Sequence, residues 1–147
     1  MKKRVNFFKP LIDKKEINNV TSVLRSGWLT NGSKTIKFEN EVKKFIGCKY
    51  AIAVNSCTNG LYAVLHAYNF KRGDEIITTP MTFISTIHNL YHYGIKIKLV
   101  DINLENLSFD NKILRKAISK KTKGILINHY GGMSNNINEV IKICKNK

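Results

Sequence analysis

The sequence predicts an α/β domain in which helices cover a largely parallel sheet. Two observations support this fold class. Four short apolar segments alternate with segments of helical periodicity, and glycine, proline or aspartate marks most boundaries between them. Such alternation is typical of parallel sheets, because parallel neighbours need a long crossover that is usually a helix. No internal repeat or low-complexity linker interrupts the pattern, so a single domain is expected over residues 1–147.

Two amphipathic helices are expected before the alternating part begins. Asp13 and Glu16 form a capping-box pattern, and apolar residues then recur every three or four positions until Gly27. Residues 27–33 resemble a loop, with a glycine near each end. A second amphipathic pattern follows and ends at Gly47, because glycine is the preferred residue after a helix C-terminus.

The alternating part predicts four strands and the helices that follow them. The expected strands are residues 51–54, 75–79, 95–100 and 124–127. The expected helices are residues 61–68, 84–90, 110–118 and 137–144. The last helical pattern is still running where the sequence ends, so the sheet is expected to be incomplete at its C-terminal side.

Composition excludes several classes of protein. Hydrophobic residues make up 43% of the chain, which argues against disorder. No apolar run approaches the roughly 20 residues that cross a bilayer, and the basic start at residues 1–4 lacks a signal core. A cytoplasmic protein is therefore expected. Cys48, Cys57 and Cys144 are widely spaced, so neither a metal site nor a disulfide framework is predicted.

The formal net charge of +15 admits anionic partners. The lysines are scattered along the chain, a distribution typical of solvated helix faces, and attraction of anionic substrates is the second interpretation. A nucleic-acid binder is the third, and it rests on charge alone because no reading motif is present. Neither nucleic acid nor a membrane is expected as a partner.

Candidate site residues follow the expected strands, because ligands of open parallel sheets bind beyond the carboxyl ends of the strands. Ser56, Thr58 and Asn59 lie where the first strand turns into a helix, and Gly60 would let a ligand approach. Such a turn is suited to a phosphate, although simple helix capping by Ser56 or Thr58 explains it equally well. It is neither a Walker loop nor a dinucleotide turn, so another phosphorylated ligand is implied.

Ring side chains follow the other two strands. Phe83 could lie flat on a planar heterocycle or pack in the core, and His129 and Tyr130 could exchange protons with a ligand or hydrogen-bond within their loop. His88 and His92 have helical i, i+4 spacing, but no glutamate lies between them as in zinc-protease helices. No metal site is predicted.

Several segments together resemble the DegT/DnrJ/EryC1/StrS family of sugar aminotransferases. Each motif is weak alone, but six occur in the family's order and at the expected spacing, from about Phe8 to Cys144. The matching segments are residues 26–32, 51–61, 73–83, 100–102, 122–125 and 129–132. The resemblance implies part of the large domain of a fold type I enzyme that depends on pyridoxal 5'-phosphate (PLP).

The resemblance assigns roles to matching positions. Thr58 and Asn59, beside Ser56, match the positions that hold the cofactor phosphate, and Phe83 matches the aromatic residue that stacks on the pyridine ring. Many relatives have Gly-Thr or Ala-Thr and a small residue where this chain has Cys57-Thr58-Asn59. Asn59 is still expected to offer its backbone N–H.

On the substrate side, Thr30 lies in the loop that resembles the one near the sugar nucleotide, and His129 and Tyr130 are expected nearby. Relatives take an amino group from glutamate and pass it to a nucleotide-linked keto-sugar, within homodimers whose active site is shared between subunits. The implied setting is the synthesis of sugars for polysaccharides or glycans.

The residue that the family uses for covalent attachment of the cofactor, the Schiff-base lysine, is expected beyond residue 147, so no catalytic residue is predicted within this sequence. The chain alone is therefore expected to be inactive. Two alternatives stay open: a non-catalytic module that binds nucleotide sugars, and a fragment of a related PLP-dependent sugar dehydratase.

Overall fold

The computed structural model describes residues 6–145, and the chain divides into two compact units. The first unit ends at Ala53 and the second begins at Val54. The sequence contains no linker at this point, so the division was not predicted. The basic start at residues 1–4 lies outside the described residues.

The first unit contains helices α1 (Lys14–Ser26) and α2 (Ser33–Ile46). The predicted capping box is confirmed: Asp13 Oδ1 accepts from the Lys15 N–H at 2.7 Å, and Glu16 Oε2 accepts from the Asp13 N–H at 2.9 Å. Gly27 and Gly47 end the two helices with φ values of 70° and 77°, as predicted. These left-handed conformations favour glycine, which has no Cβ to clash.

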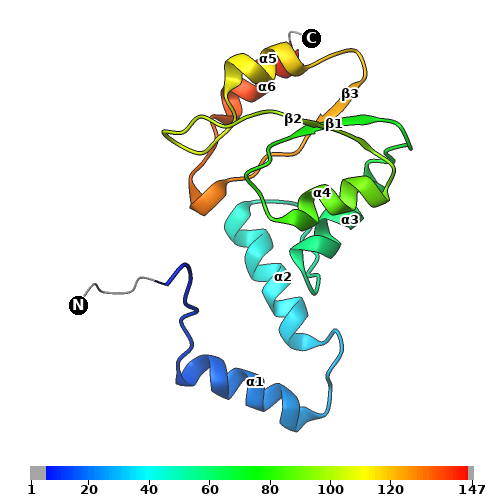
Figure 1. The fold of residues 1–147 in the computed structure, drawn as a ribbon. Coiled ribbons are helices and arrows are strands. Elements are labelled where there is room, and N and C mark those ends of the chain that lie inside the picture. The colour runs from blue at the N-terminus through cyan, green and yellow to red at the C-terminus, as the bar shows by residue number, and fades with distance from the viewer. Residues whose placement is uncertain (1–5, 146–147) are drawn as a thin grey trace, which may run out of the picture. The chain divides into compact units, whose positions relative to one another are not determined.

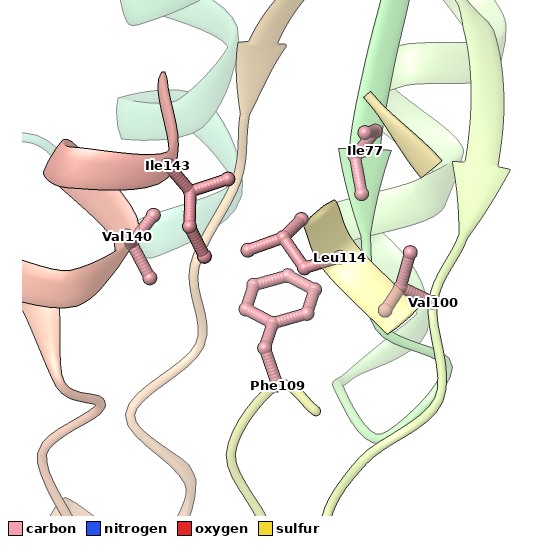
Figure 2. Packing of buried hydrophobic residues seen from close by; sticks show 6 residues of the cluster. All are labelled: Ile77, Val100, Phe109, Leu114, Val140 and Ile143. Carbon is pink, nitrogen blue, oxygen red and sulfur yellow. The ribbon is translucent and has the colours of Figure 1, made fainter. Parts of the chain in front are cut away.

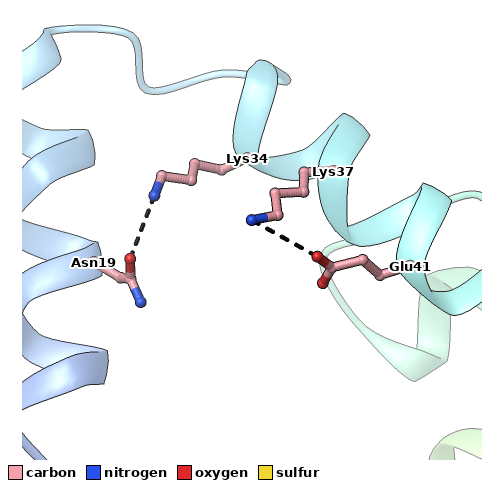
Figure 3. A network of polar contacts seen from close by, with 4 residues as sticks. All are labelled: Asn19, Lys34, Lys37 and Glu41. Atoms are coloured by element: carbon pink, nitrogen blue, oxygen red, sulfur yellow. Dashed lines mark hydrogen bonds and ion pairs between the residues drawn. The ribbon is translucent and has the colours of Figure 1, made fainter.

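Polar contacts on the first unit lie at its surface. Lys34 Nζ donates to Asn19 Oδ1 at 3.3 Å and so connects α2 to α1 (Figure 3). Within α2, Lys37 Nζ and Glu41 Oε1 form an exposed ion pair at 3.7 Å (Figure 3). Neither helix contains a buried residue, although α1 in particular has a clear apolar face.

The prediction of a strand at residues 51–54 is wrong. This apolar run pairs with no strand among the described residues, and the Ala53 N–H donates instead to Glu39 Oε1 at 2.8 Å. An apolar run favours strand conformation, but a strand forms only where a neighbouring edge completes its hydrogen bonds. The expected four-stranded sheet is therefore three-stranded in the described residues.

The second unit contains a parallel sheet in the order β2-β1-β3. Its elements, in chain order, are α3 (Cys57–Ala67), β1 (Glu75–Thr78), α4 (Ile84–His92), β2 (Lys96–Leu99), α5 (Asn111–Ala117), β3 (Thr122–Ile125), the 3-10 helix η1 (Tyr130–Gly132) and α6 (Ile137–Lys145). The α/β class and the parallel sheet are confirmed. The prediction for the last strand is two residues late, because Thr122 already pairs with Glu75.

Helices cover both faces of this sheet (Figure 1). On one face α5 and α6 enclose a core with β1, and Figure 2 shows its side chains converging from these elements. The buried members of this core are Ile77, Val100, Phe109, Leu114, Val140 and Ile143. On the other face α3 and α4 bury Leu65 and Leu90 against Ile76 and Ile95. Adjacent residues of β1 thus point to opposite cores, as expected for a strand buried on both faces.

Candidate functional site

Two loops at the carboxyl edge of the sheet are held together by a side chain. Asn128 follows β3, and its Nδ2 donates to the carbonyl of Met81 in the loop after β1 at 2.9 Å. Because β1 and β3 are parallel, both loops leave the same edge. The structure therefore brings the segment of Phe83 close to the segment of His129, as the topology rule predicts.

Helix α3 begins with a serine cap. Ser56 Oγ accepts from the Asn59 N–H at 3.2 Å, which is the capping role that the sequence left open. Asn59 Nδ2 donates to Asn55 Oδ1 at 2.7 Å. The Asn59 backbone N–H, which is expected to be offered to a phosphate, is hydrogen-bonded to the Ser56 cap in this structure.

The N–H groups of Cys57 and Thr58 remain available. Among the described residues neither group has an acceptor, since the first hydrogen bond of the helix runs from the Gly60 N–H to Ser56. Two free N–H groups and the positive end of the helix dipole favour an anion. Gly60 does not widen this site, because a Cβ there would contact Val54 Cγ2 at 3.4 Å.

A buried asparagine on α4 positions the start of α3. Asn89 lies on α4 and its Nδ2 donates to the backbone carbonyl of Thr58 at 2.6 Å. Asn89 is buried, so this hydrogen bond is shielded from competing water. It fixes the first turn of α3 on α4, the helix that begins directly after Phe83.

Phe83 is not a core residue. It is the N-cap residue of α4, and its side chain is 75% exposed. Core packing was one of the two interpretations of this residue, and the structure does not support it. A large exposed ring at the start of a helix leaves a face available for a planar ligand.

The His129 ring is hydrogen-bonded within its own loop. Its Nδ1 lies 3.1 Å from the Asn135 backbone N–H, which can only donate. Nδ1 is therefore the acceptor, and the neutral ring carries its proton on Nε2. His129 can thus donate from Nε2, whereas Nδ1 is engaged. Loop hydrogen bonding, one of its two interpretations, is what the structure shows.

Asn135 organises the loop before α6. Its Oδ1 accepts from the Phe109 N–H at 3.1 Å, and its Nδ2 donates to the Asn128 carbonyl at 2.8 Å. The side chain is only 4% exposed. Sequence analysis missed both Asn135 and Asn89, because an asparagine in a polar loop or a short helix gives no signal of burial.

Tyr130 and Thr30 lie in different units. Tyr130 begins η1 and is half-buried in the second unit. Thr30 lies between α1 and α2 in the first unit, beside a groove of about 650 Å³ that Trp28 and Ser33 also line. Trp28 Nε1 donates to the Asn31 carbonyl at 2.9 Å, which fixes the indole on this loop.

The position of the Trp28 indole requires a glycine at residue 32. A Cβ at Gly32 would lie 2.6 Å from Trp28 Cδ1, closer than real contacts allow. The glycine that the sequence placed at the end of the loop therefore packs under the indole, and α2 begins without a side-chain cap.

The described residues contain no cluster of three or more groups suited to a metal ion. Cys48, Cys57 and Cys144 are free and exposed. In the described part of the chain, no helix is long and apolar enough to cross a membrane.

Comparison with known proteins decides the family. A sequence profile described as the DegT/DnrJ/EryC1/StrS aminotransferase family matches residues 10–147. The chain belongs to this family. The resemblance inferred from the six motifs is thereby confirmed.

Relatives of this chain include two curated proteins of similar identity. The chain is 42% identical over 138 residues to the uncharacterized protein MJ1066 of Methanocaldococcus jannaschii, covering 94% of this chain and 36% of that protein. It is 41% identical over 137 residues to the spore coat polysaccharide biosynthesis protein SpsC of Bacillus subtilis, covering 93% and 35%. The chain thus spans about a third of the length of these relatives.

Solved structures have the same fold. Helicobacter pylori PseC, an aminotransferase involved in the biosynthesis of pseudoaminic acid, matches with a TM-score of 0.89 and 32% identity, over 98% of this chain and 39% of PseC. A GDP-4-keto-6-deoxymannose-3-dehydratase with a trapped PLP-glutamate geminal diamine matches with a TM-score of 0.90 and 30% identity, over 98% and 39%. This fold therefore occurs in both aminotransferases and dehydratases.

Proposed function

We propose that this chain forms the phosphate-binding and ring-stacking part of a PLP-dependent sugar aminotransferase. The observation that supports this most directly is the start of α3, where the N–H groups of Cys57 and Thr58 are free beside a Ser56 cap. Membership of an aminotransferase family, with solved relatives described as PLP and PMP forms, supports the cofactor phosphate as the anion proposed for this site.

The residues fit the cofactor. The start of α3 offers two N–H donors, and the hydroxyl of Thr58 lies on the same turn. Asn89 holds that turn rigidly, so a bound phosphate would meet donors that are already oriented. Phe83 offers an exposed ring from the neighbouring helix.

Each residue has a limited role in this proposal. The first turn of α3 binds the phosphate, and the face of Phe83 orients the pyridine ring. His129 donates a hydrogen bond from Nε2 to an anionic or carbonyl oxygen of the substrate, while Tyr130 lines the same loop. When bound, the cofactor supplies an electron sink for the reacting carbon.

The substrates are proposed for the whole enzyme and not for this chain alone. A nucleotide-linked keto-sugar would receive the amino group, with glutamate as donor, and Thr30 would contact the sugar nucleotide. One solved relative is described with bound GDP-perosamine, and a curated relative from Shewanella sediminis is named as a UDP-4-amino-4-deoxy-L-arabinose–oxoglutarate aminotransferase. A homodimer is proposed for the whole enzyme.

A dehydratase is the second candidate, favoured by the TM-score of 0.90 with a solved dehydratase. The residues described here would serve an aminotransferase and a dehydratase equally, since both enzymes need the phosphate and the ring of the cofactor to be held in place. A non-catalytic module for nucleotide sugars would use the same helix start for the nucleotide phosphate.

Cofactor binding tests the proposal. The probe is pyridoxamine 5'-phosphate, because it lacks the aldehyde that would form imines with many of the 21 lysines. The chain is expected to bind it. The variant Phe83→Leu should weaken binding about fivefold, since stacking contributes roughly 1 kcal/mol. The matched control is Tyr91→Leu, an exposed ring in the last turn of α4, which should leave binding unchanged.

The same titration discriminates among the alternatives. Equal binding by wild type and Phe83→Leu would contradict ring stacking, and tighter binding of a nucleotide sugar than of the cofactor would favour the non-catalytic module. PLP followed by borohydride should label many surface lysines weakly. Stoichiometric labelling of one lysine within residues 1–147 would overturn the proposal that the chain alone is inactive.

A further inference from the structure

Two histidines on α4 are held against each other at the protein surface. His88 and His92 are four residues apart, and their Nε2 atoms lie 2.8 Å from one another. The ring planes meet at 82° with centroids 4.1 Å apart. Both side chains are exposed, on the helix whose residues Asn89 and Leu90 are buried. In this state the Nε2–H of one ring donates to the unprotonated Nε2 of the other ring.

The separation of these nitrogens suits a shared metal ion. Imidazole binds divalent transition metals at about 2.0–2.1 Å, so two ligands at a right angle place their nitrogens about 2.9 Å apart. A tetrahedral angle would separate them by about 3.3 Å. The observed 2.8 Å is close to the separation in a right-angle ligand pair of an octahedral or square-planar ion. Binding then requires the bridging proton to move to Nδ1 and the two rings to rotate, so that both lone pairs point at the ion instead of at each other.

We propose that His88 and His92 form a two-imidazole site for a divalent transition-metal ion of the Ni²⁺ or Cu²⁺ type. Water completes the coordination, because the described residues provide no third cysteine, histidine or carboxylate in a cluster with these rings. The α-helix fixes the four-residue spacing, and solvent exposure gives the ion direct access. Sequence analysis predicted no metal site here because no zinc-protease glutamate lies between the two histidines. That glutamate is a general base and not a metal ligand, so its absence does not prevent the two rings from binding an ion.

Ni²⁺ binding tests the proposal on the intact 147-residue chain. The three exposed cysteines are first alkylated, so that sulfur ligands do not compete. Isothermal titration is expected to give one Ni²⁺ per chain. The variants His88→Gln and His92→Gln should each bind at least about tenfold more weakly, since loss of even an outer-shell partner has effects of that size.

The matched control is His66→Gln. His66 is also exposed, and its ring contacts Tyr62 and Tyr93 instead of another histidine. Its substitution should leave Ni²⁺ affinity unchanged. Equal affinity of wild type and the His88→Gln/His92→Gln double variant would overturn the proposal.

A measurement on the wild-type chain removes dependence on the folding of the variants. Cu²⁺ is paramagnetic, so substoichiometric addition should broaden the ring proton signals of His88 and His92 before those of His66 and His129. Uniform broadening of all four rings would contradict a specific site.

Discussion

The two units of this chain differ in how they use their apolar residues. The second unit encloses two cores, one on each face of its sheet, and Leu114 and Ile77 are fully buried there. The first unit has helices with equally regular apolar spacing but no buried residue in α1 or α2, and Leu24 is 60% exposed. Amphipathic periodicity therefore predicts which side of a helix is apolar, but a core needs a second surface as well.

This contrast implies different sources of stability. Burial of apolar surface stabilises the second unit, since each fully buried aliphatic side chain contributes roughly 1.5–3 kcal/mol. The first unit depends on its helix caps and exposed polar contacts, which contribute about 1 kcal/mol or less each. Substitutions should therefore have larger effects in the second unit.

The largest difference is expected for matched leucines. Leu114→Ala should lower the free energy of unfolding by about 3 kcal/mol, because it leaves a cavity between α5, α6 and β1. Leu24→Ala should cost less than about 1 kcal/mol. Urea denaturation followed by circular dichroism measures both. A cost for Leu24→Ala as large as that for Leu114→Ala would mean that α1 is packed in a core.

A buried polar residue should have the next largest effect. Asn135→Ala leaves the Phe109 N–H and the Asn128 carbonyl without partners, so it should cost about 2 kcal/mol. The Phe109 amide should also exchange its hydrogen faster. The control is Asn136→Ala, which removes two exposed hydrogen bonds, one from the Glu139 N–H and one to the Glu139 carboxylate, and should cost about 1 kcal/mol or less. Similar costs for both would contradict a central role for Asn135.

A smaller effect is expected from the carboxylate at the start of β1. The Thr122 hydroxyl donates to Glu75 Oε1 at 2.6 Å and lowers the pKa of Glu75, aided by Ser119, while partial burial opposes the shift. Because the folded pKa lies below the unfolded value, this stabilisation is complete above about pH 4.3. It is lost as the pH falls through the folded pKa.

Glu75→Gln tests this pH dependence. It should cost about 1 kcal/mol at pH 7 and almost nothing at a pH well below 4. Denaturant midpoints measured across this range decide the question. Glu105→Gln is the control, because its exposed carboxylate contacts no donor among the described residues. A cost for Glu75→Gln that does not change with pH would contradict the assignment.

The smallest effect is expected for the ion pair of the first unit. Glu41→Gln should change stability by less than about 0.5 kcal/mol, because the pair with Lys37 is exposed at 3.7 Å. The small difference should disappear in 1 M salt. A cost above about 1 kcal/mol would show that this helix face is shielded from solvent.

Helix ends were predictable from the sequence because their signals are local. Asp13, Glu16 and Asp110 cap their helices through residues within three positions, and Gly27 and Gly47 end theirs as expected. The strands were less predictable. The run at residues 51–54 had no partner edge, and the start of β3 was set by Glu75, which is 47 residues away in sequence from Thr122.

In the candidate site, too, local contacts were predictable and long-range contacts were not. Capping by Ser56 was foreseeable, because the acceptor and donor are three residues apart. The roles of Asn89 and Asn135 depend on contacts with Thr58, Phe109 and Asn128, which one sequence cannot reveal. The roles of Phe83, Thr30 and Tyr130 toward ligands stay predictions.

Trp28 provides a fluorescence signal that is specific to the first unit. It is the single tryptophan of the chain and lies in the first unit, where its indole is pinned by Asn31 and by the close approach of Gly32. Its fluorescence therefore reports on the loop beside Thr30 alone. Backbone ellipticity, in contrast, reports on the helices and strands of both units. One denaturation series recorded by both signals would reveal whether the halves melt together or in sequence, without any label or substitution.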